Sequence, residues 1–293
     1  MFDFNSCIKA ASVDHAIELL RENPERRLLA GGTDILIKLR KGKPGFSELV
    51  DIHGLEELHF LRKDDDNNIL IGSGTSFTDI IESELLQEQL PMLCDAAQSV
   101  GGPQIRNVAT IGGNICNGIT SADSAMGLFC LDAELMIKGI DGMREIPIDS
   151  FYLGPGKVDL QHGDVLLGFK ITRENYQGYG GYYYKYAMRD AMDIATIGCA
   201  VHLRLERRRM ADFRIAYGVA GPVPLRCRQA ERFAAGQEVT DALVDTIADK
   251  VREDVNPRTS WRASRDFRMN IIEELARRAT REALLRAGGE ENV

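Results

Sequence analysis

The chain has 293 residues, of which 44% are hydrophobic and 27% are charged, so it holds enough apolar mass for more than one folded core. Its formal net charge of −8 excludes a general affinity for nucleic acid or for anionic membrane surfaces. No basic segment followed by an apolar run opens the sequence, and no stretch of about 18 apolar residues occurs, so we expect a cytoplasmic protein without a membrane anchor. The six cysteines are scattered without a C-x-x-C pair, which predicts that this chain alone holds no metal site or iron–sulfur cluster.

The first 56 residues predict a small unit of alternating strands and helices. Ser12 is expected to cap a helix that Asn23-Pro24 ends. A short apolar strand that begins at Arg27 then runs into a glycine pair, and the periodic stretch 35–39 predicts a second helix. Residues 48–52 predict the strand that closes this unit.

Residues 57–175 predict a mixed sheet with several helices. Strands are expected at residues 69–72 and 133–138, and Asp141-Gly142 predicts a hairpin turn into a strand at 144–148. The helical patterns cover residues 77–86, 90–100 and 122–131.

The last part of the chain predicts a separate C-terminal domain, which follows a tyrosine-rich linker at residues 176–186. Residues 194–205 alternate between apolar and polar side chains, which predicts a strand with a hairpin partner at 212–220. Helical patterns follow at residues 240–252 and 266–286. The core-facing side chains predicted on the last helix are Phe267, Ile271, Leu275 and Ala279.

Two glycine loops are the strongest chemical signal in the sequence. They read Leu29-Ala-Gly-Gly-Thr-Asp34 and Ala109-Thr-Ile-Gly-Gly-Asn114. Adjacent glycines let backbone amides point into one concavity and approach a ligand closely, so a diphosphate can be held without a basic side chain. A tight turn between strand and helix is the alternative for each loop alone, but the repeated pattern favours a shared ligand. From these loops we expect Gly112→Val to abolish retention of that ligand with little loss of fold.

Two further segments have both a structural and a functional interpretation. The segment Gly72-Ser-Gly-Thr-Ser-Phe77 resembles part of a dinucleotide-binding turn, but Phe77 replaces the third glycine, so we interpret it as a structural strand-to-helix turn. Ser121 or Asp123 can cap the helix that begins near residue 122. Asp123 can also accept a hydrogen bond from a ribose or ribityl hydroxyl, and the two roles are compatible.

Four segments together resemble the FAD-binding subunits of bacterial xanthine dehydrogenases, within the molybdenum hydroxylase flavoproteins. They are residues 29–34, the run Gly102-Pro-Gln-Ile-Arg-Asn-Val-Ala-Thr-Ile-Gly-Gly-Asn-Ile-Cys116, Asp123, and residues 185–194. The resemblance covers essentially the whole chain, and residues 103–117 are its most specific part. No cysteine-rich insert of the kind found in related benzoyl-CoA reductase flavoproteins occurs, which favours the xanthine dehydrogenase or carbon monoxide dehydrogenase branches.

The resemblance implies an α+β fold with a vanillyl-alcohol-oxidase-type FAD-binding domain at residues 1–175, made of two subdomains at about 1–56 and 57–175. A small α/β C-terminal domain of the CO dehydrogenase flavoprotein type would follow at residues 180–290. The glycine loops would hold the FAD diphosphate, Asp123 would take a sugar hydroxyl, and Lys185 would lie against FAD. The implied FAD-binding residues are Arg27, Leu28, Leu29, Ala30, Gly31, Gly32, Thr33, Asp34, Val100, Ala109, Thr110, Ile111, Gly112, Gly113, Asn114, Asp123, Val165, Leu166, Tyr184 and Lys185.

The function implied by the resemblance is electron transfer within a larger complex. Electrons would leave a molybdenum cofactor on a large subunit, pass through [2Fe–2S] clusters on a small subunit, reach FAD on this chain and leave as hydride to NAD+ during purine oxidation. The complex would be a dimer of heterotrimers, and residues 176–184 and 185–193 are the candidates for the side from which NAD+ approaches. Two alternatives stay open: a carbon monoxide dehydrogenase or other hydroxylase flavoprotein with a different acceptor, and a non-redox nucleotide-binding assembly module.

Overall fold

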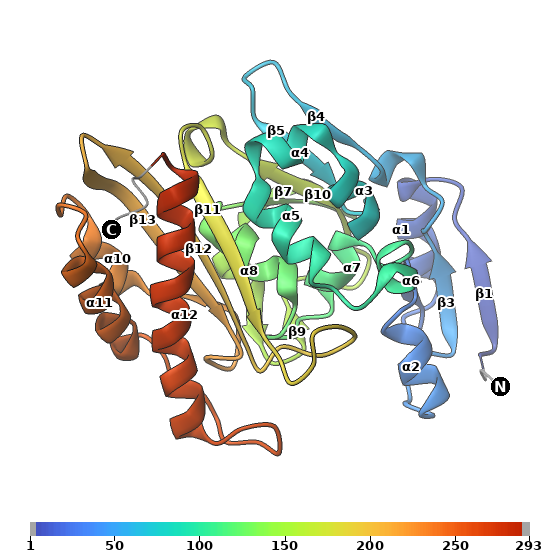
Figure 1. Ribbon diagram of the computed structural model, residues 1–293. Coiled ribbons are helices and arrows are strands. Elements are labelled where there is room, and N and C mark those ends of the chain that lie inside the picture. Colours follow the sequence, from blue (N-terminus) through green and yellow to red (C-terminus); the bar gives the residue numbers. More distant parts are fainter. Residues whose placement is uncertain (1–3, 289–293) are drawn as a thin grey trace.

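The computed structural model describes residues 4–288 and shows three units that follow one another along the chain. Figure 1 shows the N-terminal unit in blue, the middle unit in cyan and green, and the C-terminal unit in yellow to red. Each unit is built on its own sheet, and helices fill the spaces between the sheets. The fold is thus α+β, with separate sheets that bring different loops to a common cavity.

The N-terminal unit is a three-stranded parallel sheet with strand order β1-β3-β2. Its elements are β1 (Ser6–Lys9), α1 (Val13–Glu22), β2 (Arg27–Leu29), α2 (Ile35–Arg40) and β3 (Glu48–Asp51). The Ser12 hydroxyl accepts a hydrogen bond from the amide of His15, so the predicted cap of α1 is confirmed. The apolar face of α1 packs with β3 into a small core of its own, which lets this unit hold the first glycine loop in place.

The middle unit is a five-stranded antiparallel sheet with strand order β4-β5-β10-β6-β7. The strands are β4 (Leu61–Lys63), β5 (Ile69–Gly72), β6 (Glu134–Gly139), β7 (Gly142–Pro147) and β10 (Val165–Ile171), and a small hairpin is formed by β8 (Tyr152–Gly154) and β9 (Lys157–Val158). The helices are α3 (Phe77–Glu82), α4 (Glu84–Gln89), α5 (Pro91–Gln98), α6 (Pro103–Arg106), α7 (Ile111–Cys116), α8 (Asp123–Cys130) and α9 (Ile148–Phe151), with 3₁₀ turns at η1 (Glu56–Leu58) and η2 (Arg173–Asn175).

One helix predicted in the middle unit is divided in the structure. The single helix expected at residues 77–86 is two short helices, α3 and α4, because Ser83 ends the first and caps the second. Its hydroxyl accepts a hydrogen bond from the amide of Leu86 at 3.3 Å. A serine inside a helical pattern can thus restart the helix in a new direction.

The C-terminal unit is a four-stranded antiparallel sheet covered by three helices. Its elements are β11 (Gly180–Tyr186), β12 (Ile197–Glu206), β13 (Arg209–Gly218), β14 (Leu225–Arg226), α10 (Arg228–Ala234), α11 (Asp241–Lys250), η3 (Val251–Glu253) and α12 (Arg265–Arg286). The expected tyrosine-rich linker is therefore mostly a strand, β11, which pairs along its whole length with β12. Helices α10 to α12 cover one face of this sheet, whereas α5 and α8 of the middle unit pack on the other (Figure 1).

The core-facing side of α12 differs from the predicted stripe. Leu275 and Ala279 are buried, but Phe267 is 43% exposed and Ile271 is only partly buried. A spacing of four residues advances about 40° beyond each full turn of an α-helix, so a stripe of this spacing drifts across the helix surface. Only its C-terminal half can then face the core.

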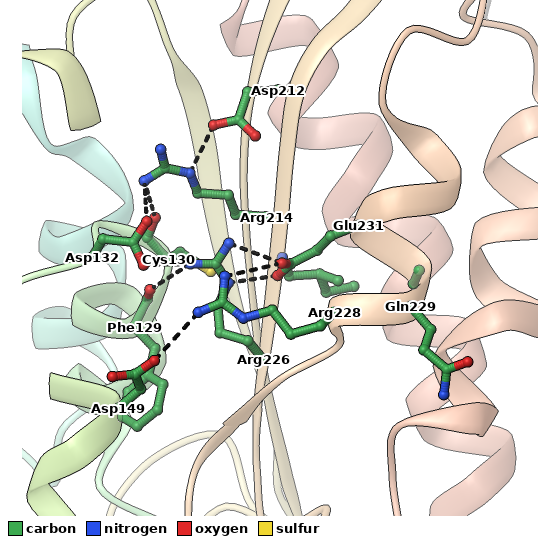
Figure 2. Close-up of polar contacts among 12 residues, drawn as sticks. Phe129, Cys130, Asp132, Asp149, Asp212, Arg214, Arg226, Arg228, Gln229 and Glu231 are labelled. Carbon is green, nitrogen blue, oxygen red and sulfur yellow. Dashed lines mark hydrogen bonds and ion pairs between the residues drawn. The ribbon is translucent and has the colours of Figure 1, made fainter. Parts of the chain in front are cut away.

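An ion network joins the middle unit to the C-terminal unit, as Figure 2 shows. Asp132, just after α8, pairs with Arg214 of β13 at 3.0 Å and with Arg226 of β14 at 2.7 Å. Arg226 also pairs with Glu231 of α10, and Arg214 donates to the carbonyl of Cys130 in the last turn of α8. The C-terminal end of α8 is therefore held by the C-terminal unit.

Candidate functional site

A cavity of about 760 Å³ lies between the N-terminal and middle units, and Ile194 of the C-terminal unit completes its lining. Its volume falls in the range of small-molecule and cofactor sites. Both glycine loops contribute to its wall. The predicted residues that line it are Arg27, Leu28, Ala30, Gly31, Gly32, Thr33, Asp34, Val100, Ala109, Thr110, Gly112, Gly113, Asn114 and Leu166.

The first glycine loop lines this cavity and carries unpaired backbone donors. The amides of residues 30–34 donate to no acceptor within residues 4–288. Gly32 has a left-handed φ of 75°, which turns successive N–H groups toward one side. A Cβ on Gly31 would lie 1.7 Å from the carbonyl oxygen of Val108, so this loop packs backbone to backbone against the middle unit. The loop is therefore fixed at the junction of two units, with unpaired backbone amides among the residues that line the cavity.

The second glycine loop has a different role from the first. The amide of Gly113 donates to the hydroxyl of Thr110, the N-cap of α7, and the amide of Gly112 donates to the carbonyl of Ser73 at 2.9 Å. A Cβ on Gly112 would lie 2.5 Å from the Cβ of Ser73 and 2.6 Å from its carbonyl oxygen. The expectation that Gly112→Val spares the fold is therefore wrong, because this glycine is fully buried against backbone.

The glycine-containing turn at residues 72–77 is a strand-to-helix turn, as predicted, and it links β5 to α3. Ser76 caps α3 through reciprocal hydrogen bonds with Asp79, which form a capping box. Ser73 and Gly74 of the same turn also line the cavity. The structural interpretation is thus correct but incomplete, since the turn supplies part of the wall.

Asp123 lies at the N-terminal end of α8, behind the cavity wall. Neither it nor Ser121 caps this helix, because the N-cap is Ala122 and no side chain bonds to the helix amides there. Instead, Asp123 accepts hydrogen bonds from Tyr183 at 2.7 Å and from the ammonium group of Lys185 at 2.9 Å. Burial raises the pKa of the Asp123 carboxyl group, and the charge of Lys185 opposes this effect.

Lys185 links this carboxylate to the wall itself. Its ammonium group also donates to the carbonyl of Ser99 at 2.9 Å, directly before Val100, which lines the cavity. The hydroxyl of Ser124, next to Asp123, donates to the side chain of Asn114, which also lines the cavity. These contacts and the ion network at the other end of α8 hold that helix at both ends.

Four other predicted residues do not line the cavity. Strand alternation turns the partly buried Tyr184 toward the core of the C-terminal unit, opposite to Tyr183 and Lys185. Val165 is fully buried in the N-terminal core, and Ile111 is fully buried in the core of the middle unit. Leu29 is partly buried at the end of β2.

Several cavity residues were missed by sequence reasoning. Lys38 of α2 donates to the side-chain oxygen of Asn117 at 3.0 Å, and both residues line the cavity. His162 also lines it and contacts the carbonyl of Leu20 through Nε2 at 2.6 Å. The sequence predicts a diphosphate site without a basic side chain, and this prediction is incomplete because Lys38 lines the cavity. The sequence position of Lys38, one helical turn after the first glycine loop, could have indicated that its side chain lies near this loop.

No metal site or bilayer-spanning helix is found in the described part of the chain. Across residues 4–288, no three His, Cys, Asp or Glu side chains gather in an arrangement that could hold a metal ion. None of the helices in this range combines the length and the apolar content that a crossing of the bilayer requires. The six cysteines are all free thiols.

Comparisons with known proteins agree with this arrangement. The family model of the FAD binding domain in molybdopterin dehydrogenase matches residues 2–172, and that of the CO dehydrogenase flavoprotein C-terminal domain matches residues 182–283. The chain is 47% identical over 289 residues, 99% of each chain, to the xanthine dehydrogenase FAD-binding subunit of Escherichia coli O157:H7. It is 31% identical over 278 residues, 94% of this chain and 95% of the relative, to the carbon monoxide dehydrogenase medium chain of Hydrogenophaga pseudoflava.

Solved structures show the same fold. A chain of the carbon monoxide dehydrogenase from Hydrogenophaga pseudoflava that lacks the Mo-pyranopterin moiety of its cofactor superposes with a TM-score of 0.93 at 29% identity, over 98% of this chain and 99% of that chain. A chain of quinoline 2-oxidoreductase from Pseudomonas putida 86 gives a TM-score of 0.90 at 24% identity over 99% of both chains, which supports the fold alone. The expected α+β architecture is confirmed. The chain belongs to the family of FAD-binding subunits of molybdenum hydroxylases, and its sequence is of the xanthine dehydrogenase type.

Proposed function

We propose that this chain binds FAD in the cavity and passes electrons from [2Fe–2S] clusters of a partner subunit to NAD+ during purine oxidation. The observation that best supports this proposal is the row of backbone amides at residues 30–34, which belong to residues that line the cavity and have no acceptor among the described residues. Such a row binds the oxygens of a diphosphate. The 47% identity to a xanthine dehydrogenase FAD-binding subunit supports the choice of complex.

The residues present fit FAD. The amides of residues 30–34 would hold the diphosphate, and Lys38 would offset part of its negative charge. Thr110 and Asn114 add polar groups, while Val100 and Leu166 belong to the apolar part of the wall. When bound, FAD supplies a flavin that can collect electrons singly and release them as a pair. The protein holds this group, excludes water from it and fixes its orientation.

Asp123 and Lys185 would affect FAD binding, although neither residue lines the cavity. Their mutual ion pair is buried, and Lys185 also binds the carbonyl next to Val100. A sugar hydroxyl that reaches this region would compete with Tyr183 for the Asp123 carboxylate. Leu29, Ile111 and Val165 would act on FAD only by shaping the wall, whereas Tyr184 packs against the C-terminal core and would not act on FAD directly.

The acceptor and the partners belong to the proposal as well. NAD+ would approach past β11 and the loop that follows it, because Ile194 of this loop lines the cavity and the amide of Met192 donates to the carbonyl of Gly101. The partners would be a molybdenum-binding large subunit and a [2Fe–2S] small subunit, assembled as a dimer of heterotrimers. A cytoplasmic location stays a prediction from the sequence.

Co-expression with the two partner chains tests this function. We expect the purified complex to reduce NAD+ when xanthine is added, and we expect a complex assembled without this chain to reduce only artificial one-electron dyes. The measurement is NADH formation at 340 nm. Xanthine oxidation that reduces dyes but not NAD+ in the full complex would contradict the acceptor, and oxidation of carbon monoxide instead of xanthine would contradict the choice of enzyme.

A further inference from the structure

The loop before α12 exposes the only tryptophan of the chain. Trp261 is 78% exposed, and the guanidinium of Arg262 lies 4.3 Å from the centre of its ring. Phe267, on the first turns of α12, is 43% exposed and lies beside Tyr186 of β11. Figure 1 shows this loop projecting from the N-terminal end of α12, away from the rest of the C-terminal unit. Large aromatic groups in such a position indicate a contact surface.

The same segment carries an excess of positive charge. Residues 256–268 contain four arginines, at positions 258, 262, 265 and 268, and one aspartate, in a chain of net charge −8. None of these four guanidinium groups pairs with a carboxylate of residues 4–288. Arg258 and Arg265 are exposed and Arg262 is partly exposed, and arginines of this kind favour negatively charged groups brought by another molecule.

Arg268, near the start of α12, connects the helix to this loop. It is only 2% exposed, and its guanidinium donates to the hydroxyl of Ser260 at 2.9 Å and to the carbonyl of Thr196. Burial, followed by the charges of Arg258 and Arg262, lowers its pKa. A buried charge without an opposite charge is costly, so a negative group held beside Arg258 and Arg262 would stabilise this arrangement.

We propose that Trp261, Phe267 and the arginines at 258, 262 and 265, here called the Trp261 surface, dock an acidic and partly apolar face of a partner subunit. The inference rests on the proposed function, because that function requires partner chains. Tryptophan and arginine are the residues that most often dominate the binding energy of protein interfaces. Carboxylates of the partner would pair with the arginines in bidentate geometry, and an apolar pocket would take the indole ring.

A protein fits this surface better than the other anionic partners do. The overall charge of the chain repels nucleic acid and anionic membranes at a distance. The surface offers one indole ring and one phenyl ring, which suit a shaped pocket. Binding of anionic lipid vesicles is kept as an outcome of the test.

The test compares assembly of the complex by the wild-type chain, Trp261→Ala and the double variant Arg258→Glu/Arg262→Glu. We expect each variant to bind the partner subunits at least about 30-fold more weakly, with unchanged FAD content and unchanged melting temperature. Arg232→Glu is the matched control, since Arg232 is exposed on α10 of the same unit. The dissociation constant is measured by titration at two salt concentrations, and the charge variant should lose most of the salt dependence.

The single tryptophan offers a second measurement on the intact complex. Subtracting the emission spectrum of the Trp261→Phe complex from that of the wild-type complex isolates the emission of Trp261. We expect this emission to be blue-shifted relative to that of the free wild-type chain, because docking buries the indole. The inference would be overturned if both variants bound the partner subunits with wild-type affinity. It would also be overturned if the variants assembled normally but lost binding to phosphatidylserine vesicles that the wild-type chain binds. Failure of the wild-type chain to join any partner subunit would instead contradict the proposed function.

Discussion

Replacement of Gly31 by alanine is expected to lower the free energy of unfolding by on the order of 3 kcal/mol and to weaken FAD binding at least about tenfold. The added Cβ would lie 1.7 Å from the carbonyl oxygen of Val108 and 2.6 Å from its carbonyl carbon. Both atoms belong to backbone, so no side-chain rotation can relieve the overlap. The N-terminal unit must then move away from the middle unit, which separates the two walls of the cavity.

The control for this prediction is Gly54→Ala, in the same unit. A Cβ on Gly54 would meet only the end of the Lys9 side chain, at 3.7 Å, and its φ requires no glycine. We expect this variant to stay within about 0.5 kcal/mol of the wild type in urea unfolding. A Gly31→Ala chain with wild-type unfolding and wild-type FAD affinity would show that the two units do not meet as described.

Arg226→Met is expected to lower the free energy of unfolding by about 3 kcal/mol, because it breaks a buried ion network. The Arg226 side chain is 5% exposed and pairs with both Glu231, 8% exposed, and Asp132. Its removal leaves the Glu231 carboxylate buried, with only Arg228 at 3.5 Å as a cationic partner. Since Arg226 also binds α8 to the C-terminal unit, the unfolding transition should broaden or split as the two parts separate.

Two variants control for the effects of charge and of size. Arg228→Met removes an exposed arginine whose two ion pairs are 3.4 Å and 3.5 Å long, and we expect a change below about 1 kcal/mol. The double variant Arg226→Met/Glu231→Leu should recover part of the lost stability, because no buried charge then stays unpaired. Equal losses of unfolding free energy in Arg226→Met and Arg228→Met would show that this ion network does not hold the two units together.

Features that depend on a few neighbouring residues were predictable from the sequence. The cap at Ser12 and the order of strand, glycine loop and helix at residues 27–40 are confirmed, since each depends on local hydrogen bonds or local backbone freedom. The predicted hairpin is also present, but its turn lies one residue earlier, at Ile140 and Asp141, because Gly142 already pairs with Gly139. The alternation of β12 is also as predicted, with Val201 and Leu203 facing the C-terminal core. Its opposite face is buried as well, including His202, because the middle unit covers it, and no local pattern could show that.

Features that depend on distant contacts were not predictable. Gly112 was expected to serve the ligand, but the backbone of Ser73 lies against it, and this neighbour is known only once β5 and α7 are placed. Lys38 and Asn117 meet across 79 positions of sequence, so neither stands out alone. The hydrogen-bond partners of Asp123 were not predictable either, since Tyr183 and Lys185 come from β11 of another unit.

The most direct test of the cavity as the FAD site is the flavin content of the purified chain, compared with that of Gly113→Val. A Cβ at Gly113 would meet only the hydroxyl of Thr110, at 3.0 Å, and would project from an exposed position on the cavity wall. We expect the wild-type chain to carry one FAD, seen by its visible absorbance, and the variant to lose it while keeping its unfolding curve. A well-folded wild-type chain that takes up no FAD when supplied with excess cofactor, or a variant that retains one FAD per chain, would contradict the assignment.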